Sequence, residues 1–119
     1  MERQRLFERL PAEAQQEIQR RFRVLDEFRR HALRSLTDEE RSQLEALPEE
    51  ERRAFVDERV RGHLRRLSED LAHQLPDQAE RIRAMPPEER ILLGHRLREE
   101  HKRRMAREKL AEAVERGWL

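Results

Sequence analysis

Apolar residues recur along the chain at intervals of three and four positions, which is the spacing of one face of an α-helix. They predict two long amphipathic helices, over residues 11–35 and 48–74. The mean intervals of about 3.6 and about 3.8 residues exceed the roughly 3.5-residue period of a coiled coil. A globular bundle is therefore favoured over a two-stranded coiled coil. The first line consists of Ile18, Phe22, Leu25, Phe28, Ala32 and Leu36, and the second of Val56, Val60, Leu64, Leu67, Leu71 and Leu75.

A third long helix is expected over residues 87–116, with Gly117 as its terminator. Its first part is apolar as far as Leu97, but residues 98–104 are all polar and leave two turns without an apolar anchor. We therefore expect the helix to project past the bundle after Leu97 and its last part to dock on a second subunit or another protein. Alternatively, the helix packs back on its own chain, with His101 and the arginine stems covering the gap. The expected interface is the apolar stripe formed by Ala106, Leu110, Ala113, Val114 and Trp118.

Three apolar-x-x-apolar-Pro segments divide the chain, and their prolines lie 37 and then 38 positions apart. Proline disfavours helical geometry in the residue before it and suits the first turn of a new helix. Acidic residues follow each proline, near the positive end of the next helix dipole. The pattern predicts three units of about 38 residues, each a short helix followed by a long one, although Pro-Glu-Glu is also simply a common helix start. The segments are 7–11, 44–48 and 82–86, and the units are 1–35, 36–74 and 75–119.

The helix starts carry further local signals. Thr37 and Glu40 have the spacing of a capping box and predict the start of a short helix. Leu10, Leu47 and Met85 occupy the expected N-cap sites of the long helices. Apolar side chains cannot cap a helix, so we expect these three to pack inward.

The composition supports an all-α fold. Of 119 residues 45% are charged and 4% aromatic, with no Cys, no Tyr and only three Gly. Strands and tight turns need more β-branched, aromatic and glycine residues, so an all-β fold is excluded. The length suits one domain, residues 1–119. Large aliphatic and Phe residues make up less than a quarter of the chain, which predicts a thin core that gains buried surface by self-association.

Arginine dominates the basic residues, yet the net charge is only +1. Nucleic-acid-binding domains usually have a clear basic excess, and here acidic residues are interleaved with the arginines. The codon bias of a GC-rich bacterial genome explains this preference more simply. The arginine-rich stretches at 20–23 and 102–104 keep an Arg-mediated nucleic-acid binder as an alternative.

The residues that could carry metal or catalytic chemistry are few. Several His lie three or four positions from a carboxylate, but with 26 acidic residues such pairs arise by chance, and no His-Glu-x-x-His motif occurs. No Ser or Thr lies in a glycine-bounded elbow, and there is no glycine-rich phosphate loop. We therefore expect no metal site, no cofactor and no enzymatic activity. The histidines are His31, His63, His73, His95 and His101.

The N-terminal residues contain no apolar segment typical of a signal peptide, and no apolar run approaches membrane-spanning length. The expected compartment is the cytoplasm, or the periplasm if a signal peptide has been removed.

Three helix starts, at 36–41, 47–52 and 85–90, resemble the repeated Leu-[Ser/Thr]-x-Glu-[Glu/Gln]-[Arg/Gln] motifs of Spy/CpxP-type periplasmic chaperones and related heavy-metal-resistance sensors. The resemblance implies an exported, α-helical, dimeric protein that binds partner or client proteins and sometimes metal. The chain lacks the Gln usual in the motif and a signal peptide, so compartment and metal binding are not carried over.

The preferred function is a non-catalytic helical protein–protein interaction or scaffold module that forms a homo-oligomer or binds another protein. A chaperone-like or metal-responsive bacterial helical protein is the first alternative, and an Arg-mediated nucleic-acid-binding protein the second.

Overall fold

The computed structural model describes residues 2–118, which form six α-helices and one 3₁₀ turn and contain no strand. The all-α prediction is confirmed. Short and long helices alternate along the chain, and the three long ones begin and end within one residue of the predicted positions. The elements are α1 (Glu2–Glu8), α2 (Ala12–Arg34), α3 (Asp38–Ala46), α4 (Glu49–Gln74), η1 (Pro76–Gln78), α5 (Ala79–Ala84) and α6 (Pro87–Glu115).

The three long helices begin in the same way. Pro11, Pro48 and Pro86 are the N-cap residues, with φ near −56° and extended ψ. No side chain forms a capping hydrogen bond at the start of these helices. The acidic residues in each first turn are therefore the groups that offset the positive end of the helix dipole. The placement of Leu10, Leu47 and Met85 at the N-cap was wrong, because the following proline takes that position in all three helices. The inward packing expected of Leu10 was also wrong, since Leu10 stays 38% exposed, whereas Leu47 and Met85 are half-buried.

The predicted capping box of α3 is confirmed. The Thr37 hydroxyl accepts a hydrogen bond from the Glu40 amide at 3.1 Å, and the Thr37 amide donates to the Glu40 carboxylate at 3.2 Å. The hydrogen bond from Thr37 holds the pKa of Glu40 below its usual value. This reciprocal pair fixes where the chain turns from α2 into α3.

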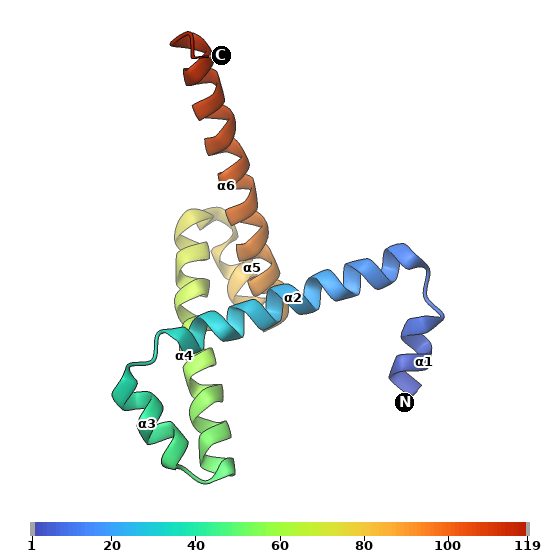
Figure 1. The fold of residues 1–119 in the computed structure, drawn as a ribbon, viewed down its shortest axis with the longest axis vertical. Coiled ribbons are helices and arrows are strands. Elements are labelled where there is room, and N and C mark those ends of the chain that lie inside the picture. Colours follow the sequence, from blue (N-terminus) through green and yellow to red (C-terminus); the bar gives the residue numbers. More distant parts are fainter. Residues whose placement is uncertain (1, 119) are drawn as a thin grey trace.

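The core lies where the three long helices meet. Figure 1 shows α2 crossing both α4 and α6, and each of the three contacts the other two. Val24 and Phe28 of α2 and Ile91 of α6 are buried there, and half-buried side chains of α4 pack around them. A Cβ atom at Gly94 would lie 2.9 Å from Leu67 Cδ1, so glycine permits the close approach of α6 to α4.

The short helices pack unequally. α5 packs on α4, and Ile82, Leu71 and Ala72 are buried there. α3 contacts α4 more lightly, and α1 lies away from the other helices at the far end of α2 (Figure 1). The alternation of short and long helices is therefore a property of the chain's local structure, while the packing differs from one short helix to the next.

The molecule is extended. Its radius of gyration is 19.3 Å, compared with about 13.5 Å for a compact domain of this length. Two segments account for this, α1 with the first turns of α2, and the last part of α6 (Figure 1). From residue 100 to residue 118 every side chain except that of Ala113 is exposed.

Among residues 2–118 there is no helix with both the length and the apolar character needed to cross a membrane.

Candidate protein-interaction site

The last part of α6 carries the predicted interface residues away from the rest of the chain. We call residues 105–118 the α6 tail. Ala106, Leu110 and Val114 follow one another at four-residue spacing, so they lie on one side of the helix. Leu110 is 56% exposed and Val114 59% exposed, and nothing in residues 2–118 covers them. The tail does not fold back on its own chain, which was the alternative expected from the sequence.

Gly117 ends the helix, as predicted, and sets the position of Trp118. Its φ of 76° lies in the left-handed region, which glycine adopts without a steric cost. The Trp118 amide then donates to the Ala113 carbonyl at 2.9 Å, which closes the end of the helix. The Arg116 guanidinium lies 5.3 Å from the centre of the indole ring, a cation–π contact. Trp118 is held in place by these contacts while its ring remains 69% exposed.

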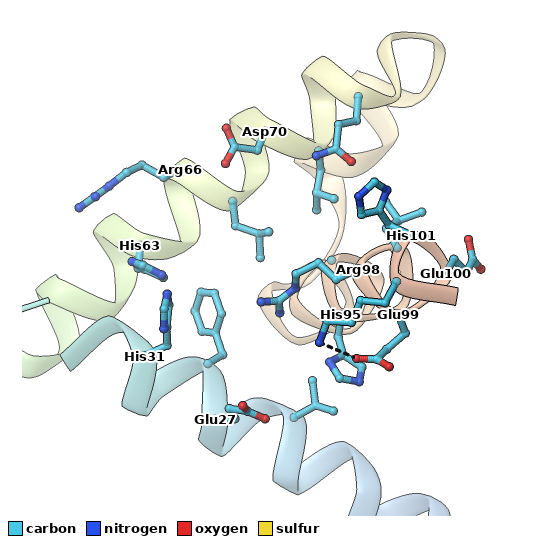
Figure 2. Close-up of a pocket in the computed structure, with 18 of the residues that line it drawn as sticks. Glu27, His31, His63, Arg66, Asp70, His95, Arg98, Glu99, Glu100 and His101 are labelled. Carbon is cyan, nitrogen blue, oxygen red and sulfur yellow. Dashed lines mark ion pairs between the residues drawn. The ribbon is translucent and has the colours of Figure 1, made fainter. Parts of the chain in front are cut away.

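A groove opens beside the base of the tail, between α2, α4 and α6 (Figure 2). We call it the interhelical groove. Its volume is about 1120 Å³. The apolar side chains that line it come from all three helices, and the charged ones lie around them. The apolar lining consists of Val24, Phe28, Leu67, Leu71 and Leu97.

Four of the five histidines gather in this groove: His31 of α2, His63 of α4, and His95 and His101 of α6. The His63 ring lies edge-on to Phe28 and to His31, with 5.3 Å between ring centres in both pairs (Figure 2). Burial lowers the pKa of His63 below its ordinary value of 6.5, and the positive groups nearby lower it further. Residues 2–118 contain no group of three or more His and carboxylate side chains arranged to hold a metal ion.

The charged residues of the groove are only partly paired. Glu99 lies 3.6 Å from Lys102, and Arg104 donates a hydrogen bond to Nδ1 of His101 at 3.2 Å. Arg34, Arg66 and Arg98 form no ion pair with any carboxylate of residues 2–118, although carboxylates such as Asp70 line the same groove. The groove therefore offers guanidinium groups to a partner that brings acidic side chains.

The tail could be predicted from the sequence, but the groove could not. His31 and His63 lie 32 positions apart, and they meet only because α2 crosses α4. No local spacing marks such a meeting. The one available signal was the position of His63 beside Leu64, which belongs to the apolar line of residues 48–74 and so favours a partly buried histidine; His63 is half-buried in the structure.

Comparisons of the chain with protein-family models, with curated proteins and with solved structures gave no match.

Proposed function

We propose that this chain is a non-catalytic helical protein-interaction module that self-associates through the α6 tail. The interface residues are those expected from the sequence: Ala106, Leu110, Ala113, Val114 and Trp118. Large apolar side chains in a row on an unpartnered helix are typical of interaction sites, because water contact with them is unfavourable.

The observation that carries this proposal is the total exposed surface. The chain exposes 10329 Å², whereas a compact monomer of 14.6 kDa exposes about 6900 Å². The excess of about 3400 Å² exceeds the roughly 800 Å² per partner that a standard interface buries. Association with another chain removes such an excess, and self-association does so without requiring a second kind of protein.

The small core supports the same conclusion. Eight apolar side chains of the described residues are buried, and only Ile82 and Ala32 are fully so. A helix segment that leaves such a core gains nothing from tertiary packing, and isolated helices of this length are marginal in water. A tail docked on a partner is stabilised by the apolar area that it buries.

The three-unit organisation belongs to the same proposal. The carbonyls of Pro11, Pro48 and Pro86 each accept a hydrogen bond from the amide four residues later, at 3.0, 2.8 and 3.2 Å. These equivalent junctions support an internal repeat with units 1–35, 36–74 and 75–119 inside one domain. We propose that the repeat sets where each long helix starts, while the contacts that each unit makes have diverged.

The first test is the mass of the protein in solution, measured by light scattering, with and without residues 105–119. We expect an oligomer for the full chain and a monomer after truncation. An unchanged mass, with stability retained, would contradict the proposal.

A point-variant test separates the stripe from the rest of the tail. Replacing both Leu110 and Val114 by Ser removes two exposed apolar side chains, and we expect association to weaken by about tenfold or more. Leu6→Ser makes the same chemical change at a similarly exposed site outside the tail and is expected to leave the mass unchanged.

A further inference from the structure

We propose that the interhelical groove binds an acidic amphipathic helix of another protein, and that Arg98, His31 and His63 hold a carboxylate of that helix. Each of these three side chains comes from a different long helix. The site uses none of the apolar residues of the α6 tail, so it is independent of the self-association proposed above.

Two arginines of the groove lack the partners that the other arginines have. Most arginines of the long helices have a carboxylate three or four positions away on the same helix, and five do not. Three of these five have other partners: Arg59 contacts Glu40, Arg90 donates to Ser68, and Arg107 donates to the carbonyl of Arg103. The other two are Arg34 and Arg98, and both line the groove. Their guanidinium groups form no ion pair or hydrogen bond within residues 2–118.

Arg98 continues the buried face of α6. It follows Ile91 by seven positions and Gly94 by four, and both of these residues are buried, so all three share one side of the helix. Figure 2 shows the Arg98 side chain extending from α6 toward His31 and His63. The three groups therefore offer N–H donors to the same part of the groove.

The surroundings of His63 are positively charged. After burial, the groups that lower the pKa of His63 are His31, Arg66, Arg59 and Arg98, in that order. Positive charge from all three long helices therefore acts on this ring. Such a position disfavours a metal cation and favours an anion.

The carboxylates that line the groove do not compensate this charge. Two of the four already pair with cations of α6, at 3.6 and 4.0 Å. The other two form no ion pair within residues 2–118, and Figure 2 shows them on α2 and α4, away from Arg98. The paired carboxylates are Glu99 and Glu100, and the unpaired ones are Glu27 and Asp70. A carboxylate brought by a partner therefore meets an Arg98 guanidinium that has no competing partner.

The rest of the groove fits a helix with an apolar side. Leu67 and Leu97 line the groove and are only half-buried, so they leave apolar surface for a partner to cover. The long helices use their backbone groups in their own hydrogen bonds, so an extended peptide finds no strand edge to pair with. A helix satisfies its own backbone groups. The side of the groove that α6 forms, from Gly94 to Arg107, is about 21 Å long, which a helix of about 14 residues spans.

Two other occupants fit less well. A nucleic acid would bring phosphates close to Glu27 and Asp70, and single strands need exposed aromatic rings for stacking, whereas Phe28 is buried. The α6 tail of a second copy carries as many basic as acidic residues, so it lacks the negative charge that the groove attracts.

The probe for this site is a fluorescein-labelled synthetic helix of about 14 residues, with Glu on one side and Leu on the other. We expect the full chain to bind it with a Kd that rises as salt is added, because the contact includes exposed charges. A peptide with Lys in place of Glu, and one with Ser in place of Leu, should each bind at least about tenfold more weakly. Fluorescence anisotropy measures all three, and no binding of the Glu and Leu peptide would overturn the proposal.

Charge reversal at one arginine locates the peptide on the chain. Arg98→Glu is expected to raise the Kd of the peptide at least about fivefold. Arg103→Glu is the matched control, because Arg103 is exposed on the same helix but does not line the groove. This control is expected to change the Kd by less than about twofold, since salt screens a charge outside the contact. Equal effects in the two variants, both shown to be folded by circular dichroism, overturn the groove as the site.

Two more measurements on the same samples identify a different occupant. Single-stranded DNA that binds more tightly than the peptide, and loses this binding in Arg98→Glu, would overturn the acidic helix as the partner. A dimer of the unliganded chain that Arg98→Glu dissociates, seen by light scattering, would show that a second copy fills the groove. A monomeric chain that still binds the peptide through Arg98 supports this site and contradicts only self-association through the tail.

Discussion

Gly94 and Gly62 both lie within helices, but the space around their Cα atoms differs. A Cβ at Gly94 meets Leu67 at 2.9 Å, whereas the nearest atom to a Cβ at Gly62 is 3.7 Å away, on the side chain of Arg65. Both lie inside helices, where alanine is preferred to glycine. We expect Gly62→Ala to raise the free energy of unfolding by about 0.5–1 kcal/mol. Gly94→Ala should lower it by about 1 kcal/mol, because Leu67 must move.

Urea unfolding of the two variants at one protein concentration measures this difference. An equal increase in the free energy of unfolding of both variants would show that α6 and α4 are not in close contact at Gly94.

His63 determines the direction in which the folding stability changes with pH. Its pKa is lowered by burial first, and then by His31, Arg66, Arg59 and Arg98. The folded chain therefore binds this proton less well than the unfolded chain. Stability is complete above the ordinary pKa of 6.5 and decreases as the pH falls below it, until the pH passes the lower folded value.

We expect His63→Gln to reduce the loss of stability on going from about one pH unit above 6.5 to about one unit below it. His73→Gln, at an exposed site outside the groove, is expected to keep the full loss. Unfolding curves at the two pH values make the comparison, and equal losses in the wild type and His63→Gln would contradict it.

Among single residues, those with local partners could be predicted and those with distant partners could not. Thr37 and Glu40 are three positions apart, so the sequence contains their whole interaction. The Arg90 guanidinium donates to the Ser68 hydroxyl at 2.7 Å across 22 positions, and nothing in the sequence pairs these two residues. The histidines of the groove likewise have partners that are distant in the sequence, so their meeting could not be predicted.

At the scale of elements, one arginine fixes the short helix α3 against α4. Arg59 of α4 lies 3.3 Å from the Glu40 carboxylate and donates to the Ser35 carbonyl at 3.2 Å. Arg59 and Glu40 are each about 30% exposed, so water screens this pair less than the ion pairs on the outer faces. We expect Arg59→Met to lower the free energy of unfolding by about 1–2 kcal/mol and to speed amide exchange in residues 36–47.

Arg53→Met is the matched control. Arg53 pairs with Glu49 at 3.4 Å, but both side chains are more than 70% exposed. Its replacement is expected to cost no more than about 0.5 kcal/mol. A similar cost for both variants would show that Arg59 does not hold α3 in place.

Helix positions were predictable because each is determined by a short stretch of neighbouring residues. The prolines and the apolar period placed the three long helices within one residue. The crossing of α2 over α4 and α6 was not predictable, because it depends on where side chains of separate helices interlock. In the sequence Gly94 is only an isolated glycine. Its role in the close packing of α6 on α4 depends on Leu67, which lies beside it only in the folded chain.

At the scale of the whole molecule, self-association links stability to concentration. If docking of the tail completes the fold, the Tm of the full chain should rise by a few degrees when the protein concentration is raised about tenfold. The chain truncated at residue 104 should show no such rise. Calorimetry at several concentrations measures both, and a concentration-independent Tm for the full chain would count against self-association through the tail.

The end of the tail also makes the protein its own optical probe. Trp118 is the single tryptophan, and the chain has no tyrosine, so indole emission comes from this one position. The ring is 69% exposed in the isolated chain, held by the turn at Gly117 and by Arg116. Burial of the ring on a second chain shifts its emission to shorter wavelength, and dilution reverses the shift. The fluorescence of the unlabelled protein therefore reports the docking of the tail directly, at concentrations too low for scattering.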